Sequence, residues 1–232
     1  MSGFVFKQFS IGQTHTAMKV STDGILLGAW AHVSDAARIV DIGTGTGLLA
    51  LMAKQRAPKA VVNAIEIEAN ACIDARANFA NSPWPDIMLY QGAVQSFKAA
   101  TPFDAIITNP PYFNASLKGD NAARNTARHT DGLSFSELIK ACSALSHAHT
   151  LLNVILPCPE AEQFIAIAEQ EGWYLNHLCL VKTTEKKAPS RSLMLFSQVA
   201  APLTTTHLTI HANSGAYSAE YSALCKDFYL KM

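Results

Sequence analysis

Arg38-Ile39-Val40-Asp41-Ile42-Gly43-Thr44-Gly45-Thr46-Gly47 is the stretch that decides the fold. It begins as a short apolar run of strand length, continues into three alternate glycines, and is followed by an apolar helical pattern over 48–55. A strand, a glycine-rich turn and a helix in this order begin an α/β unit. Because glycine lets the backbone approach a ligand closely, we expect a binding turn at the carboxyl end of a buried strand.

Strand-like and helix-like runs alternate through the rest of the chain. Further strands are expected at 60–67, 87–90, 103–108, 151–156, 174–181 and 193–199, and helices at 69–80, 134–147, 160–170 and 217–230. This alternation predicts a mostly parallel sheet with helices on both faces. Only the basic loop 183–192 joins the last two strands, so we expect that pair to be antiparallel. Ser134 and Glu137 have the spacing of a capping box at the start of a helix.

The length and composition favour one folded domain without a strong global charge. The chain has 232 residues, of which 49% are hydrophobic and 16% charged, and its formal net charge is zero. We expect a single domain over 1–232, with a lead-in segment at 1–37, a catalytic core at 38–200 and a C-terminal extension at 201–232. A nucleic-acid partner would have to be bound by local basic patches, because the chain has no overall positive field.

Cysteine and histidine usage predicts neither disulfides nor a metal site. The five cysteines are odd in number and dispersed, which is typical of reduced thiols in a cytosolic protein. The eight histidines lack metal-ligand spacing, and His147 and His149 are expected near the C-terminal end of a helix. No signal peptide precedes the first strand, and the apolar runs are too short to cross a bilayer. We therefore expect a cytoplasmic protein with no metal and no membrane partner.

The glycine turn has the spacing G-x-G-x-G, because Leu48 stands where a dinucleotide enzyme needs its third glycine. This spacing favours a ligand without a pyrophosphate, and the candidate cofactor residues in the turn are Asp41, Gly43, Gly45 and Gly47. Glu66 ends the second strand about 20 residues later, where a carboxylate can bind a ribose diol. Glu68 is the weaker alternative, and a solvated strand end is the non-functional interpretation of Glu66.

Asn109-Pro110-Pro111-Tyr112 follows the strand at 103–108 and is suited to binding a planar amine. The side-chain oxygen of Asn109 and the backbone carbonyl of Pro110 can both accept hydrogen bonds from one NH₂ group. Tyr112 can stack on the ring that carries the amine. The catalytic candidates are therefore Asn109, Pro110 and Tyr112, although a proline turn at the end of a strand gives the same pattern.

Taken together, these motifs resemble those of class I S-adenosylmethionine (SAM) methyltransferases that act on amino groups. The closer resemblance is to the bacterial family that methylates N6 of adenine at nucleotide 37 of the valine tRNA with the cmo5UAC anticodon. It rests on five segments that span nearly the whole chain: 3–9, 18–30, 41–51, 109–113 and 217–230. The resemblance implies a Rossmann-like fold with a seven-stranded, mostly parallel sheet and an antiparallel strand at the C-terminal end. It also implies SAM as cofactor and the tRNA anticodon loop as partner.

The same resemblance suggests further contacts and one departure. Ala93 stands where these enzymes often carry an acidic residue that binds the cofactor's adenine. Thr22 and Asp23 are expected either to contact SAM or to cap the following helix. Substrate contacts are expected from Tyr112 and Phe113 by stacking, and from the basic loops by phosphate binding, with solvated surface as the alternative for the loops. The basic candidates are Arg128, Lys187 and Arg191, with Lys118, Arg124, His129 and Lys186 beside them.

Three other functions remain open from the sequence. A protein-glutamine N5-methyltransferase would present the same planar amide to Asn109 and Pro110. N6-adenine methylation of DNA or rRNA would use the same site. A SAM-binding module without catalysis is disfavoured by the presence of both Asn109 and Tyr112. The oligomeric state is also open, with a monomer favoured.

Overall fold

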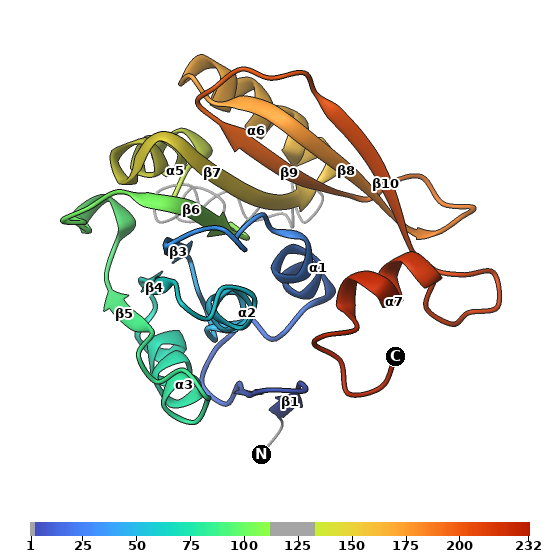
Figure 1. Ribbon diagram of the computed structural model, residues 1–232, viewed down its shortest axis with the longest axis horizontal. Coiled ribbons are helices and arrows are strands. Elements are labelled where there is room, and N and C mark those ends of the chain that lie inside the picture. Colours follow the sequence, from blue (N-terminus) through green and yellow to red (C-terminus); the bar gives the residue numbers. More distant parts are fainter. Residues whose placement is uncertain (1–2, 112–132) are drawn as a thin grey trace, which may run out of the picture.

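A single mixed sheet runs through the centre of the computed structural model, which describes residues 3–111 and 133–232. The sheet has eight strands in the order β10-β8-β9-β7-β6-β3-β4-β5 (Figure 1). The bounds are β3 Arg38–Ile42, β4 Val61–Glu66, β5 Met88–Gln91, β6 Phe103–Thr108, β7 Ser146–Pro157, β8 Tyr174–Thr184, β9 Arg191–Ser197 and β10 Thr204–His211.

Strand direction confirms the expected fold class. Strands β5, β4, β3, β6 and β7 are parallel, whereas β9 is antiparallel to both of its neighbours, β7 and β8. The strand order reverses at β3, which pairs with β4 on one side and with β6 on the other. In open α/β sheets, ligands bind outside the carboxyl ends of the strands at such a reversal. The glycine turn after β3 and the Asn109 turn after β6 therefore begin beside each other.

The sheet has one strand more than the expected seven. Strand β10 pairs in parallel with β8 and forms the edge of the sheet on that side. Its sequence, Thr-Thr-Thr-His-Leu-Thr-Ile-His, is mostly polar. Only Leu208 and Ile210 carry the alternating apolar pattern on which a strand prediction depends, and both are buried.

Helices cover both faces of the sheet (Figure 1). Helices α1 (Thr22–Trp30), α2 (Leu48–Arg56) and α3 (Ala69–Ala80) contribute to one hydrophobic cluster, and α5 (Phe135–Leu145) and α6 (Cys158–Gln170) to the other. Neighbouring residues of β3 face opposite sides, since Ile39 belongs to the first cluster and Val40 to the second. The capping box predicted for α5 is confirmed, because Ser134 and Glu137 exchange side chain-to-backbone hydrogen bonds.

The two ends of the described chain lie together. Strands β1 (Gly3–Val5) and β2 (Ser10–Gly12) form a hairpin, and Phe6 pairs with Tyr229 beyond helix α7 (Ala219–Cys225). The backbone N–H of Lys7 donates to the carbonyl of Phe228 at 2.8 Å. Phe6, Tyr221 and Phe228 belong to the same cluster as the core strand residue Ile39. These contacts support the single-domain interpretation, which stays a prediction.

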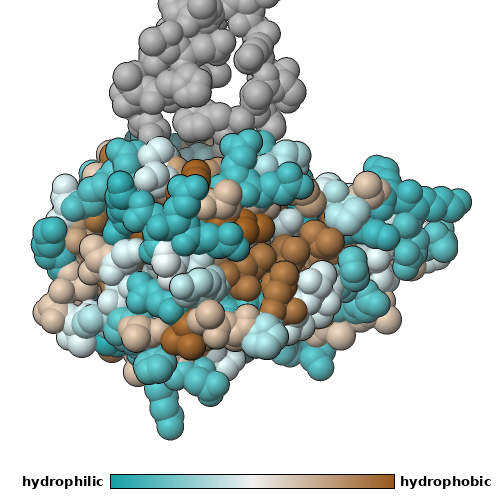
Figure 2. All heavy atoms as spheres, turned by 90° about the horizontal axis from the view of Figure 1, so that it is seen from above, coloured by the Kyte–Doolittle hydropathy of each residue, from teal (hydrophilic) through white to brown (hydrophobic). Residues whose placement is uncertain are grey.

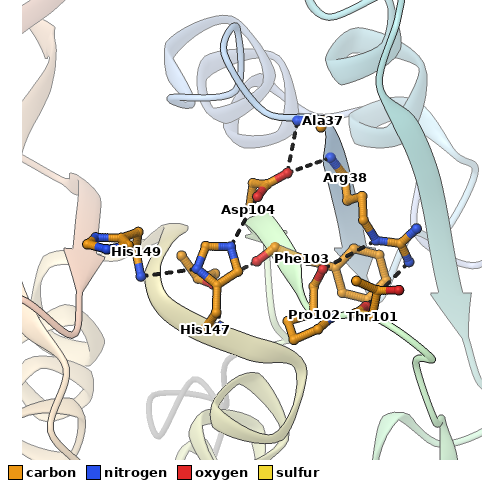
Figure 3. A network of polar contacts seen from close by, with 9 residues as sticks. Ala37, Arg38, Thr101, Pro102, Phe103, Asp104, His147 and His149 are labelled. Atoms are coloured by element: carbon orange, nitrogen blue, oxygen red, sulfur yellow. Dashed lines mark hydrogen bonds and ion pairs between the residues drawn. The ribbon is translucent and has the colours of Figure 1, made fainter.

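His147 and His149 lie on β7, so the expectation that they end a helix is wrong. Helix α5 stops at Leu145, and the extended backbone of Ser146 starts the strand. His147 Nε2 contacts Asp104 Oδ1 at 3.0 Å, and His147 Nδ1 accepts from the backbone N–H of His149 at 3.1 Å (Figure 3). Asp104 also accepts from the backbone N–H groups of Ala37 and Arg38 at 2.9 and 2.8 Å. This network links the amino ends of β3, β6 and β7, opposite the glycine turn.

The face seen from above Figure 1 mixes hydrophilic and hydrophobic side chains, and its largest hydrophobic patch lies near the centre (Figure 2). Within 3–111 and 133–232, no helix is long and apolar enough to cross a membrane. The same ranges hold no group of three or more His, Cys, Asp or Glu side chains that could bind a metal ion.

Candidate active site

A cavity of about 620 Å³ lies at the carboxyl ends of β3, β4 and β6. Its walls come from the turns after β3, β5 and β6, the end of β4, the segment before α1, and helix α5. The structure thus brings together residues that are more than 60 positions apart in the sequence. The predicted site residues on the walls are Gly43, Gly45, Glu66, Asn109 and Pro110, together with Ala93.

The glycine turn presents backbone to the cavity. Gly45 has a φ of +56°, and a Cβ added there would meet nothing within 4 Å. The space in front of this glycine is therefore open to a ligand. Gly47 does not line the cavity. It has a φ of +85° at the N-cap of α2, and a Cβ there would lie 2.4 Å from the Phe79 ring, so it serves packing.

Glu66 lies at the end of β4 and lines the cavity while only 8% exposed. Its Oε2 accepts from the backbone N–H of Gly45 at 2.8 Å, and its Oε1 accepts from the backbone N–H of Glu68 at 2.9 Å. These two hydrogen bonds fix the carboxylate beside the glycine turn. Each oxygen retains a second lone pair that could accept a hydroxyl, which is what binding a ribose diol requires.

Asp41 is fully buried and does not line the cavity. Its Oδ2 accepts from the Thr44 hydroxyl at 2.5 Å and from the backbone N–H of Ala50 at 3.1 Å. It therefore links the glycine turn to α2. The direct cofactor contact for which Asp41 was a candidate has no support in this geometry. Burial raises its pKa to about 7, the two hydrogen bonds oppose that rise, and the nearby charge of Glu66 adds to it. Oδ1 has no hydrogen-bond partner among the described residues.

Asn109 and Pro110 lie on the cavity wall directly after β6. The preceding residue, Thr108, is buried, and its hydroxyl donates to the backbone carbonyl of Ile42 at 3.0 Å. This bond links the turn that carries Asn109 to the strand that leads into the glycine turn. The other predicted contacts of this region lie outside the described residues: Tyr112, Phe113, Lys118, Arg124, Arg128 and His129.

One wall of the cavity was missed from the sequence, and it is the segment from His15 to Ser21. Asp74 of α3 accepts from the backbone N–H groups of His15 and Thr16 at 2.9 and 2.8 Å. Asn78 lies one turn further along α3. Its Oδ1 accepts from the backbone N–H of Gly12, and its Nδ2 donates to the carbonyls of Gly12 and Thr46, each at 2.8 Å. The sequence signal that could have indicated this wall is the pair Asp74 and Asn78, two polar side chains four positions apart on the buried face of a helix.

Thr22 and Asp23 do not line this cavity. The N-cap of α1 is Ser21, whose hydroxyl accepts from the backbone N–H of Gly24, so the capping role expected of Thr22 or Asp23 belongs to the residue before them. Asp23 instead contacts Arg191, whose Nε donates to Oδ2 at 2.7 Å. Both Asp23 and Arg191 line a second cavity, whereas Lys187 is exposed after β8.

The cavity fits a nucleoside with a charged side chain better than a phosphate ligand. The glycine turn offers close backbone approach, Glu66 offers a carboxylate for a diol, and that carboxylate disfavours a phosphate. Ala93 lies on the wall, and so does Gln95, two positions later in the 3-10 helix η1 (Val94–Ser96). An amide is therefore present near the position where the enzymes that the sequence resembles often carry an acidic residue. Asn109 places an amide at the same cavity, where a second molecule carrying an amine could meet the first.

Comparisons with known proteins agree with this geometry. The family described as "Methyltransferase small domain" matches residues 22–131. A relative from Pseudoalteromonas translucida, named tRNA1(Val) (adenine(37)-N6)-methyltransferase, is 56% identical over 232 residues, covering 100% of both chains. A relative of the same name from Vibrio campbellii is 45% identical over 231 residues, covering 99% of this chain and 96% of its own. The chain belongs to the tRNA1(Val) (adenine(37)-N6)-methyltransferase family.

Solved structures support the fold independently of the family. A predicted O-methyltransferase from Agrobacterium tumefaciens has a TM-score of 0.68 at 22% identity, covering 89% of this chain and 96% of its own. TYW2 from P. horikoshii in complex with MeSAdo has a TM-score of 0.59 at 15% identity, with 84% and 70% covered. The fold is that of class I methyltransferases, and SAM is the cofactor of this family.

Proposed function

We infer that this protein transfers a methyl group from SAM to N6 of adenine 37 in the anticodon loop of valine tRNA. One observation carries the inference: Asn109 and Pro110 share a cavity with the glycine turn and Glu66. This arrangement occurs in a chain that is 56% identical over its whole length to a relative named for that reaction. Both relatives described above are named for the tRNA reaction, and neither is named for a rival substrate, which would be a glutamine amide or adenine in DNA or rRNA.

SAM supplies an electrophilic methyl group with a neutral leaving group, so the demand on the protein is to position and activate the nucleophile. We propose that Glu66 binds the ribose diol and that Gly43 and Gly45 let the backbone approach the rest of the cofactor. Asp41 acts indirectly, because its hydrogen bonds to Thr44 and Ala50 fix the shape of the glycine turn. The amide of Gln95 is available near Ala93 for the cofactor's base.

The nucleophile is difficult because the lone pair of adenine N6 is delocalised into the ring. We propose that the side-chain oxygen of Asn109 and the carbonyl of Pro110 accept hydrogen bonds from the N6 amine and orient its lone pair. As nitrogen acquires positive charge, these two fixed dipoles stabilise it. Holding both reactants in one cavity supplies much of the remaining acceleration. No strong base is needed beforehand, because the methylated amine is acidic and loses its proton afterwards.

The adenine must leave its stack to reach Asn109, and an unpaired loop base does so at lower cost than a paired one. Stacking by Tyr112 and Phe113, and phosphate contacts by Arg128 and Lys187, stay predictions from the sequence. For Arg191, the predicted phosphate contact is disfavoured by its ion pair with Asp23. We propose a monomer that acts in the cytoplasm, where tRNA is modified.

Product analysis tests the reaction. Wild-type protein is incubated with labelled SAM and separate pools of tRNA, rRNA, DNA and protein, and digested products are identified by mass spectrometry. We expect N6-methyladenosine in valine tRNA. Label in glutamine, or only in DNA or rRNA, would replace the proposal with the corresponding rival.

The role of Asn109 is tested by Asn109→Ala in single-turnover methylation. Loss of one preorganised oxygen at the reacting nitrogen should lower the rate roughly 10²–10³-fold. SAM affinity, measured by calorimetry, should stay near the wild-type value. Asn81→Ala is the control, because Asn81 is an exposed asparagine at the end of α3. Near-normal turnover in Asn109→Ala would show that the motif is only a proline turn at the end of β6, without a catalytic role.

A further inference from the structure

A second cavity, of about 330 Å³, shares a wall with the candidate active site. That wall is the first turn of α1, where Ser21 and Gly24 line the active-site cavity and Thr22 and Asp23 line the second one. What separates the two cavities is therefore this one turn, in a helix about 10–12 Å in diameter. A polymeric ligand can therefore enter both cavities by passing over a single turn.

Aromatic side chains form one wall of the second cavity. His211 at the end of β10 stacks on Tyr217, with ring centroids 5.2 Å apart and an interplanar angle of 20°. Tyr221 lies against Tyr217 with a centroid distance of 4.9 Å. Tyr217 is 43% exposed despite these contacts, so the aromatic wall is open to solvent. Stacked aromatic side chains with solvent access are the surfaces on which proteins bind unpaired bases.

An ion pair forms another part of the lining of the second cavity. Arg191 Nε donates to Asp23 Oδ2 at 2.7 Å, and the two side chains are 30% and 17% exposed. Arg191 also donates to the carbonyl of Ser190 at 2.9 Å. A phosphate would meet the carboxylate of Asp23, and a simple cation would meet the guanidinium of Arg191. A neutral, planar ring whose edge carries both donors and acceptors suits such a pair.

We propose that this second cavity binds an unpaired base of the substrate RNA next to the adenine that enters the active site. The aromatic wall stacks on the base, and the Asp23–Arg191 pair contacts its polar edge. The proposal rests on the proposed function and adds a second binding position to it. It also gives Asp23 and Arg191 a joint role in substrate binding, since they face this cavity and not the cofactor cavity.

The test combines protein variants with abasic RNA in a double-mutant cycle. The RNAs are valine tRNA with an intact target adenine, and two versions that lack the base at nucleotide 36 or 38. The variants are Tyr217→Ala and, as a second probe of the same wall, His211→Ala. Tyr174→Ala is the matched control, because Tyr174 is also 43% exposed but begins β8, away from both cavities. Dissociation constants for RNA and for SAM are measured, and circular dichroism checks the fold.

Tyr217→Ala should weaken binding of intact RNA roughly 5- to 100-fold, and removing the correct neighbouring base should weaken wild-type binding equally. Combining the two changes should cause no further loss, because both remove the same contact. SAM affinity and the Tyr174→Ala control should be unchanged. Additive losses for both abasic RNAs, or unaltered RNA affinity in both wall variants, would overturn the proposal. Methylation of intact tRNA by the wild-type protein distinguishes failure of this proposal from failure of the proposed function. If methylation occurs but the effects of the Tyr217 variant and the abasic RNA are additive, only the role of the second cavity is refuted. If methylation does not occur, the proposed function is refuted as well.

Discussion

The hydroxyl of Thr108 donates a hydrogen bond of 3.0 Å to the carbonyl of Ile42, linking the last residue of β6 to the last residue of β3. Asn109 follows the first of these residues and the glycine turn follows the second. The relative position of the methyl-accepting and cofactor-binding turns therefore depends in part on one buried contact.

Thr108→Val should lower the rate of methylation while leaving SAM affinity nearly intact, because it frees the Asn109 turn and not the glycine turn. It should also lower the free energy of unfolding by about 1–3 kcal/mol, since it leaves a buried carbonyl unpaired. Thr150→Val is the control: its buried hydroxyl donates to the carbonyl of Phe103 at 2.6 Å, at the other end of β6. Because that hydroxyl also accepts from the backbone N–H of His147 at 2.8 Å, the loss of stability in Thr150→Val should be at least as large. Equal loss of activity in both variants, at equal loss of stability, would show that Thr108 has no positioning role.

Gly45→Ala should abolish or strongly weaken SAM binding, because its methyl group would occupy the open space at the cavity wall. Gly172→Ala is the control, since Gly172 also has a positive φ, +81°, and open space around it, but lies in the turn between α6 and β8. Both variants should lose about 1–2 kcal/mol of stability from left-handed backbone strain. Calorimetric SAM titration that is alike in the two variants would contradict a cofactor role for the glycine turn.

The pH dependence of stability should change in Asp41→Asn. Burial raises the pKa of Asp41 to about 7, so the folded protein retains a proton that the unfolded chain releases from about pH 4 upward. Wild-type stability should therefore fall as the pH rises from 4 to 7, by at most about 1.4 kcal/mol per pH unit from this group. Asparagine mimics the protonated form and lacks this loss. The free energy of unfolding of the variant should therefore rise relative to that of the wild type as the pH increases from 4 to 7. Denaturant unfolding without SAM from pH 4.5 to 8 measures the difference, and parallel curves would contradict the shifted pKa.

Asp104→Asn should have the opposite pH dependence. Burial alone would raise the pKa of Asp104, but hydrogen bonds from His147, Arg38 and Ala37 outweigh it and leave the pKa below its ordinary value (Figure 3). The stabilisation from this carboxylate is present above the unfolded pKa and is lost as the pH falls through the folded one. The variant should be less stable than wild type at pH 7, with the gap closing below about pH 4. A gap that widens in acid would exclude this explanation. Activity should be retained, because the network lies at the amino ends of the strands.

Lys187→Ala tests whether the exposed loop after β8 contacts RNA. Loss of one phosphate contact should weaken tRNA binding and reduce the slope of log affinity against log salt by about one. Glu185→Gln, in the same loop, is the control for a general change in local charge. An unchanged salt slope in Lys187→Ala would remove this residue from the interface.

Local sequence pattern was sufficient for the elements whose residues carry strong periodicity. The runs 38–42 and 103–108 are β3 and β6 with the predicted bounds, because buried parallel strands are continuous apolar runs. Strand β10 and the hairpin β1–β2 were missed, since short or polar edge strands depend on pairing with distant segments. The predicted tail helix at 217–230 is shorter, at Ala219–Cys225, because the residues after it pair with the N-terminal segment.

The candidate site likewise contains residues that the sequence pattern could place and others that it could not. Glu66, Gly45 and Asn109 could be placed from sequence because each follows a recognisable strand, and carboxyl ends of parallel strands meet at one edge. The wall from His15 to Ser21 could not, because its position depends on hydrogen bonds to Asp74, 58 and 59 positions away. The orientation of α1 is likewise a tertiary property. It decides that Thr22 and Asp23 face away from the cofactor cavity.

The pairing of Phe6 with Tyr229, and of Lys7 with Phe228, has a consequence for biosynthesis. The hairpin that precedes the His15–Ser21 wall leaves the ribosome well before its packing partner, which lies more than 200 positions later in the sequence. At about 5–20 residues per second, that interval is on the order of ten to forty seconds. A nascent chain can therefore form its central strands while the hairpin before that wall still lacks its packing partner. We therefore expect translation products truncated before Phe228 to methylate tRNA more slowly than the full sequence does.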